Sequence, residues 1–237
     1  PEIVERLVTA PRNNVAFTNP SPDRRYFLKT ESEGLPTIEA FGKFHYRLGG
    51  LEVDPKANRA RVLTTRGSVG LTLLDPNTGA MRTIETPKGA IVNGATWSPD
   101  GKQIGYIASF DAATHIFVAD VASGKSVQIT KTPLLAVRVT SFDWTTDGSH
   151  IVTVLLPDNR PAEPKAPEIE TGPLVRTSDG RVLKNVNYAS LLRDPHEKDL
   201  LDYYTMGQLA LIDVKTKAVK KIGQPSLITA VDASPDA

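Results

Sequence analysis

The residue types that most often carry catalysis are present in this chain, but they do not form a recognised catalytic pattern. A hydrolase serine is typically presented in a G-x-S-x-G turn between a strand and a helix. The nearest string, RGSVG (66–70), has Arg66 in place of the first glycine and precedes a strand-like run. We therefore interpret Gly67 and Gly70 as loop glycines at the end of an insertion.

The histidines and paired aspartates do not match a metal site either. No histidine lies in an H-E-x-x-H motif, and the chain has no cysteine to complete a Cys/His cluster. The segment DWTTDG (143–148) lacks the alternating oxygen ligands of a calcium loop. We expect structural or solvated roles for the four histidines, which are His45, His115, His150 and His196. The sequence accordingly predicts no catalytic residue, no metal and no cofactor.

Composition narrows the class of protein. The 237 residues carry 28 Lys and Arg against 27 Asp and Glu, so the basic excess of a nucleic-acid-binding surface is missing. No apolar run approaches the length of a membrane span. The 18 prolines and 17 glycines between short apolar runs indicate a turn-rich, mostly β chain.

A polar turn recurs four times along the chain. Each copy places an aromatic or small residue before a Ser/Thr-Pro/Thr-Asp turn, and an alternating strand follows the first three copies. The copies are NPSPDRRYFL (19–28), TWSPDGKQIGYIA (96–108), DWTTDGSHIVTVL (143–155) and VDASPDA (231–237). Four such turns indicate a repeated structural unit.

A second element lies between these turns and consists of two strands joined by a tight polar loop. Its first strand ends in an aspartate that can accept backbone hydrogen bonds in an Asx-turn. Gly79 and Gly124 suit the positive φ of this loop, whereas Lys217 in the third copy predicts a different or less tight turn. The three copies are 71–84, 116–129 and 209–222, with Asp75, Asp120 and Asp213 at equivalent places.

The spacing of these elements predicts a partial β-propeller. Asp75 and Asp120 are 45 residues apart, which matches the ~40–45-residue period of a four-stranded blade. The distance from Asp120 to Asp213 is 93 residues and requires an insertion. We assign a helical lead to 1–12, blade 1 to 13–86 with an insertion at about 31–68, blade 2 to 90–130, blade 3 to 136–222 with an insertion at about 157–205, and the start of a blade 4 to 226–237.

The second insertion begins with a proline-rich run that disfavours regular structure. The leucines of NYASLLRDPHEKDLLDYY (187–204) then predict a pair of short helices, with Asp194 as N-cap and Pro195 as the first helical residue. Because the last residues, ASPDA, stop inside a blade turn, we expect a piece of a longer protein.

Several segments together resemble a known family. They are YRLGGLEVDPKANRAR (46–61), VNGATWSPDGKQIGY (92–106), IFVADVASGK (116–125), TGPLVR (171–176) and YASLLRDPHEKDLLDYYTMGQLALIDV (188–214). Their order and spacing are similar to the N-terminal half of the glutamyl endopeptidase branch of the prolyl oligopeptidase (S9) family of serine peptidases, found in chloroplasts and many bacteria. The resemblance covers nearly the whole chain.

The resemblance implies a parent protein with a propeller of about seven blades and a C-terminal α/β-hydrolase domain that carries a Ser-Asp-His triad. Such an enzyme cleaves peptides after acidic residues, chiefly Glu, without metal or cofactor, and its propeller limits access to the catalytic chamber. No catalytic residue of the family falls on this chain, which would be non-catalytic by itself. Its implied partners are peptide substrate and the hydrolase domain.

A peptidase directed to acidic residues must offer a cation to the substrate carboxylate, ideally an arginine that binds in bidentate fashion. Five arginines lie in or beside the two insertions, and the sequence does not rank them. They are Arg47, Arg59, Arg61, Arg160 and Arg176.

The alternative interpretation is a TolB-like propeller that binds protein partners without peptidase activity. The two insertions argue against it, because docking propellers tend to have uniform blades. We expect export to a bacterial periplasm or secretion, with the chloroplast as the other location, and no membrane span. Open blade edges predict self-association of the isolated piece.

Overall fold

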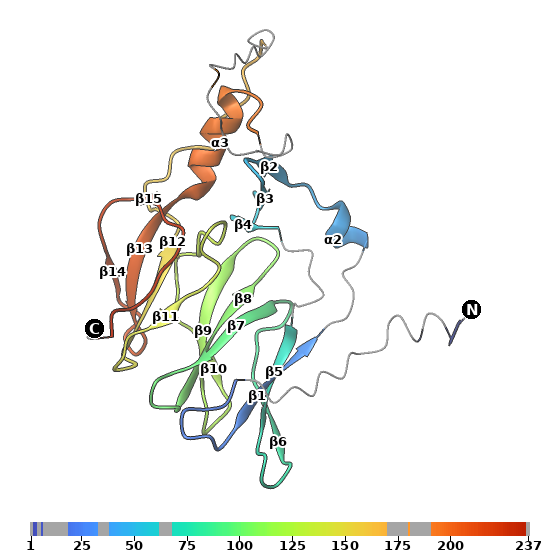
Figure 1. The fold of residues 1–237 in the computed structure, drawn as a ribbon, viewed down its shortest axis with the longest axis vertical. Helices are drawn as coiled ribbons and strands as arrows, with labels where there is room; N and C mark the ends of the chain where they lie inside the picture. The colour runs from blue at the N-terminus through green and yellow to red at the C-terminus, as the bar shows by residue number, and fades with distance from the viewer. Residues whose placement is uncertain are drawn as a thin grey trace.

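The computed structural model describes residues 2, 3, 6, 19–32, 38–61, 68–169, 180 and 191–235. These residues form antiparallel sheets of seven, five and three strands, accompanied by two short helices (Figure 1). No helix in the described ranges has the length and apolarity that a membrane crossing needs. The predicted helical lead over 1–12 lies almost entirely outside the described residues.

Two four-stranded units have the meander order of a propeller blade, in which each strand pairs with the next along the chain. The first contains β7 (Ile91–Trp97), β8 (Gln103–Ser109), β9 (Thr114–Asp120) and β10 (Ser126–Gln128). The second contains β11 (Asp143–Trp144), β12 (His150–Leu155), β13 (Met206–Asp213) and β14 (Val219–Lys221). The short β15 (Ser226–Leu227) pairs with the start of β13.

A third unit precedes them along the chain and consists of β1 (Phe27–Ser32), β5 (Ser68–Leu74) and β6 (Met81–Ile84). The predicted all-β partial propeller is thereby confirmed, because the strand order is that of successive blades. We refer to the units as blades 1, 2 and 3 in chain order.

Blade 2 is buried on both faces, since side chains alternate across each strand. On β8, Tyr106 points into the core shared with blade 1, whereas Ile107 points into the core shared with blade 3. Blade 1 contributes Leu28, Leu71, Leu73 and Ile84 to the core that it shares with blade 2. Blade 3 contributes Phe142, Trp144, Ile151, Ala210 and Ile212 to the core that it shares with blade 2. Neighbouring blades are therefore joined by continuous apolar cores.

The repeated turns have one geometry. Ser98 Oγ donates to Asp100 at 2.7 Å, and the backbone N of Lys102 donates to the same carboxylate at 3.0 Å. Asp23 and Asp147 accept equivalent pairs of hydrogen bonds. These aspartates are structural turn residues, as predicted. The end of the fourth copy, 236–237, lies outside the described residues.

The predicted Asx-turns are also present, with Asp75, Asp120 and Asp213 each accepting a backbone N–H two or three residues on. The prediction for Lys217 was wrong, because it adopts φ 62° and its N donates to the Asp213 carbonyl at 2.8 Å, as Gly79 and Gly124 do with Asp75 and Asp120. The third turn therefore keeps the geometry despite the cost of a side chain at positive φ.

The prediction for Gly70 was wrong as well. It lies inside β5, where it pairs with Glu31 of β1, and a Cβ there would come 3.0 Å from the carboxylate at the flexible end of that side chain. Gly67 lies outside the described residues.

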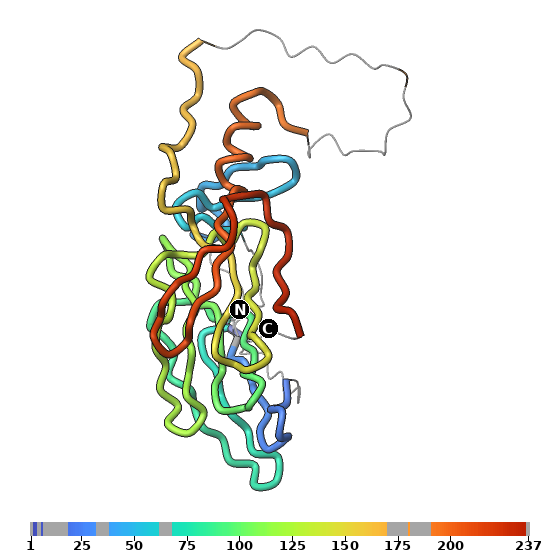
Figure 2. Tube along the Cα trace, turned by 90° about the vertical axis from the view of Figure 1, so that its left-hand side faces the viewer, coloured from blue at the N-terminus to red at the C-terminus, as the bar shows by residue number. Residues whose placement is uncertain are grey.

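Both insertions leave their blades after the strand that follows a Ser/Thr-x-Asp turn, which is β1 in blade 1 and β12 in blade 3. The first runs from β1 to β5 and contains α2 (Ile38–Gly42), β2 (Tyr46–Leu48), β3 (Leu51–Asp54) and β4 (Arg59–Ala60). The second runs from β12 to β13 and contains α3 (Pro195–Thr205). Because these connections lie at one end of the blades, the two insertions meet there (Figures 1 and 2).

Helix α3 begins as predicted, with Asp194 Oδ1 accepting from the N of Glu197 at 2.8 Å and Pro195 in the first turn. The expected partner helix is not formed over 191–194, and 187–190 lies outside the described residues. Leu200 and Tyr204 of α3 pack with Leu48 and Val53 of the first insertion.

The blade 2 and blade 3 interface depends on the missing side chain of Gly105. A Cβ there would lie 2.8 Å from two ring carbons of Phe142 and 2.9 Å from Trp144. We expect Gly105→Ala to lower the free energy of unfolding by about 1–3 kcal/mol, the usual cost of overpacking. Chemical denaturation measures this. Gly42→Ala is the control, because its Cβ meets nothing within 4 Å, and an equal loss in both variants would contradict the interface.

Candidate functional site

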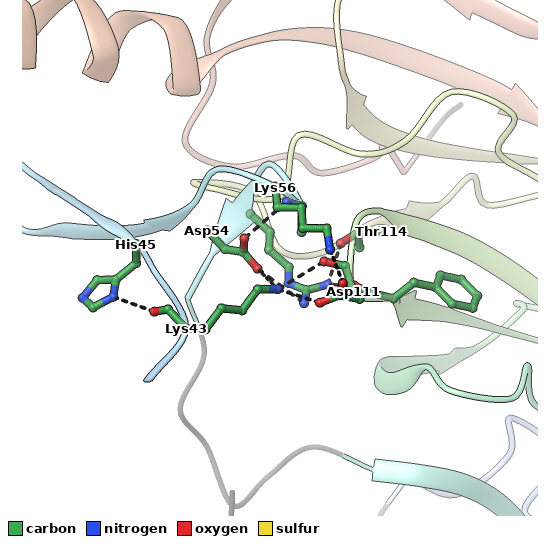
Figure 3. Close-up of polar contacts among 9 residues, drawn as sticks. Lys43, His45, Asp54, Lys56, Asp111 and Thr114 are labelled. Atoms are coloured by element: carbon green, nitrogen blue, oxygen red, sulfur yellow. Dashed lines mark hydrogen bonds and ion pairs between the residues drawn. The ribbon is translucent and has the colours of Figure 1, made fainter. Parts of the chain in front are cut away.

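A charged cavity lies between the first insertion and the end of blade 2 that carries the connection between β8 and β9. Its volume is about 390 Å³, and its lining combines cations, carboxylates and apolar side chains. The residues that matter here are Lys43, Phe44, Asp54, Arg59, Ile91 and Asp111. Figure 3 shows that Lys43 and Lys56 converge on the carboxylate of Asp111.

Asp54 is the buried centre of the cavity wall. Its side chain is only 6% exposed, and it accepts from Lys43 Nζ at 2.9 Å while Arg59 Nη2 lies 3.8 Å away. The pairing of β3 with β4 places Asp54 directly opposite Arg59. Burial lowers the pKa of Arg59, opposed by the charges of Asp54 and Asp111. Arg59 Nη1 also donates to the Phe110 carbonyl at 2.6 Å, which fixes its orientation.

Asp111 is the exposed carboxylate of the same cluster. It lies in the tight connection between β8 and β9, its side chain is 69% exposed, and it accepts from Lys56 and, at 3.0 Å, from Lys43. These hydrogen bonds, that of Lys56 first, lower the pKa of Asp111 to about 2. Burial would lower the pKa of Lys43, but its hydrogen bonds to Asp54 and Asp111 raise it. Asp111 and Lys43 are therefore both charged at neutral pH.

The structure separates the five predicted arginines. Arg59 and Arg61 line the cavity. Arg61 binds Glu52 at 3.1 Å and the Phe41 carbonyl at 2.6 Å, and its buried Nε has no hydrogen-bond partner in the described part of the chain. Arg47 is exposed beside Glu52 and does not line the cavity. Arg176 lies outside the described residues.

Arg160 joins the two insertions. Its guanidinium lies 3.6 Å above the centre of the Tyr203 ring and donates to the Tyr203 carbonyl at 2.8 Å and to the side chain of Asn58. Burial lowers its pKa, opposed by nearby acidic groups. Beside it, Tyr46 donates to Glu163 at 2.7 Å, and this hydrogen bond, with burial, raises the pKa of Tyr46 to about 12. Arg160 is thus a positioning residue.

Sequence reasoning missed the part played by Lys43 and Asp111. The two residues are 68 positions apart, in segments that share no motif, and the cluster forms only when the first insertion folds over blade 2. No local signal would have found them, because a single exposed apolar side chain such as Phe44 is common on protein surfaces.

A serine, a histidine and an aspartate lie together at the start of β12 without forming a triad. Ser149 Oγ is 2.6 Å from both His150 Nδ1 and Asp147 Oδ2, and His150 Nε2 is 3.8 Å from Asp213. The pKa of Asp147 is about 2, held there first by the Ser149 hydroxyl, so that hydroxyl donates to Asp147. His150 then donates to Ser149 and cannot accept its proton, as a general base must.

Within the described residues, no group of three His, Asp or Glu side chains could hold a metal ion. Nδ1 of His115, near the start of β9, lies 3.1 Å from both the carbonyl and the hydroxyl oxygen of Thr130. Burial lowers the pKa of His115, which favours a neutral, structural side chain.

The fold and this cavity define a partial propeller with a ligand-sized charged pocket at its insertion-bearing end. No family model matches the chain. It is 29% identical over its whole length to a protein of Oryza sativa subsp. japonica, and 27% identical to one of Arabidopsis thaliana, both named "Probable glutamyl endopeptidase, chloroplastic". The chain is thus similar over its entire length to two proteins that carry this name, which confirms the resemblance.

The chain spans about a quarter of these relatives, 26% and 25% of their lengths. Among solved structures, an acylaminoacyl peptidase of Pyrococcus horikoshii aligns with 86% of this chain over 24% of the peptidase's own length. The sequence identity is 13% and the TM-score is 0.44. TolB of Acinetobacter baumannii aligns with 76% of this chain over 29% of TolB's own length, at 14% identity and a TM-score of 0.35.

The hydrogen bonds to Asp111 predict its titration. Because the folded pKa of about 2 lies below the ordinary 3.8, ionised Asp111 stabilises the folded chain above about pH 3.8, and this contribution is lost as the pH falls toward 2. In Lys56→Met, the carboxyl pKa measured by NMR should rise toward 3.8. Asp147, whose pKa of about 2 depends on Ser149 and Thr145, should not move. An unchanged Asp111 pKa would contradict the ion pairs.

Proposed function

We propose that the chain is a non-catalytic propeller segment of a serine peptidase that cleaves peptides after Glu and other acidic residues. The observation that supports this most strongly is the alignment of the whole chain with two relatives named as glutamyl endopeptidases. The acyl-transfer chemistry would belong to an α/β-hydrolase domain elsewhere in the protein.

The propeller would restrict which peptides reach that domain. Its two insertions are held together by Arg160 and by an apolar core that includes Leu48, Val53, Leu200 and Tyr204. A cap built from packed side chains keeps its shape better than a pair of independent loops, so it can exclude folded proteins while unfolded peptides pass. The relatives' names favour a chloroplast-type location over export.

The intact protein should hydrolyse a chromogenic peptide with Glu before the scissile bond, and the matched Gln peptide at a much lower rate. A serine-directed reagent should abolish turnover, because the proposed nucleophile is a serine. Residues 1–237 expressed alone should show no turnover, and this is the matched control for the location of the chemistry.

Two outcomes would contradict the proposal. Hydrolysis by residues 1–237 alone would place a nucleophile in this chain. Absence of peptidase activity in the intact protein, together with a stable protein partner, would instead support the binding-module alternative.

A further inference from the structure

The cluster around the cavity brings two lysine ammonium groups onto one exposed carboxylate, that of Asp111. Lys43, Lys56 and Arg59 face two carboxylates, those of Asp54 and Asp111. Asp111 is shared by the two ammonium groups of Lys43 and Lys56, and Arg61 and Glu39 also line the cavity. We propose that the cavity is a subsite for the acidic side chain of a peptide, and that Asp111 competes with the ligand for the same ammonium groups; this rests on the proposed function.

The two carboxylates of the cluster differ in a way that permits such competition. Asp54 is buried and holds Lys43 in place from inside the wall. Asp111 lies at the surface on a short connection, and Lys43 itself is 32% exposed. Exposed ion pairs are weak because water and salt screen them, so a ligand carboxylate can replace Asp111 beside Lys43 and Lys56 without disturbing Asp54.

The rest of the cavity suits a peptide. Phe44 and Ile91 line it and are both exposed, so they can contact the aliphatic part of a Glu side chain and its backbone. Glu39 lines it from α2, and a carboxylate ligand must bind away from that side, toward Lys43. The cavity also lies at the end of the blades where the two insertions meet, on the surface that we propose peptides pass.

The proposal predicts a gain of affinity on removing a carboxylate. Binding is measured on the intact protein by fluorescence anisotropy, with a labelled Glu peptide whose following amide is N-methylated to prevent cleavage, and with the matched Gln peptide. Asp111→Asn should lower the Kd for the Glu peptide about two- to fivefold, the scale of an exposed ion pair. Lys43→Met should raise that Kd about tenfold or more, because a charge-assisted hydrogen bond is lost. Neither substitution should change the Kd of the Gln peptide.

The matched control is another exposed pair of the same types, Asp158 with Lys221. Asp158→Asn and Lys221→Met should leave the Kd for the Glu peptide unchanged. A gain of affinity cannot come from misfolding, so Asp111→Asn remains informative even if Lys43→Met is poorly folded.

An unchanged or raised Kd in Asp111→Asn would overturn the subsite and leave a purely structural ion cluster. This result is distinguishable from failure of the proposed function. If the intact protein cleaves Glu peptides while Asp111→Asn shows no gain, the function stands and the subsite falls. If the affinity shifts occur without cleavage, the subsite stands and the peptidase proposal falls.

Discussion

The burial of blade 2 on both faces is the constraint on which the rest of the structure depends. Its central strands must supply two apolar surfaces, so alternating residues such as Tyr106 and Ile107 serve different cores. Apolar burial stabilises such a stack by roughly 25 cal/mol per Å², and each apolar face of blade 2 is covered by a neighbouring blade. Gly105 marks the limit of this packing, because the rings of Phe142 and Trp144 occupy the space of its side chain.

The stacking of blades also determines where the insertions lie. Each replaces a connection that in blade 2 is the short hairpin around Asp111, so all three connections emerge at the same end. The first insertion reaches across blade 2 to the segment before β11, where Ala60 N donates to the Ala136 carbonyl at 2.8 Å and Ala136 N donates to the Asn58 carbonyl at 3.0 Å. Backbone hydrogen bonds hold the first insertion to that segment. The ion pairs of Lys43 and Lys56 with Asp111 hold it to blade 2.

Local features of the fold could be predicted from the sequence because their causes are local. The Ser/Thr-x-Asp turns, the Asx-turns and the Asp194 cap each depend on residues within six positions of one another. Lys217 was misjudged because a propensity for glycine is a preference that a strong surrounding turn can override. Gly70 was misjudged because its close neighbour, Glu31, comes from another strand.

The candidate site could be predicted only in part. Arg59 and Arg61 were among the five candidates, but nothing local shows that Lys43 meets Asp111 or that Arg160 stacks on Tyr203. Those contacts depend on how each insertion folds back over the blades. The blade boundaries and the roles of partners stay predictions.

The central claim is that the two insertions and the segment before β11 form one structural unit, and native-state hydrogen exchange of Arg160→Ala tests it most directly. Loss of the contacts to Asn58 and Tyr203 should speed exchange at the amides of Ala60 and Ala136, which donate across the junction. Amides in the centre of blade 2, such as that of Tyr106, should keep their protection. Unchanged exchange at Ala60 and Ala136 would contradict the account and make the insertions independent loops.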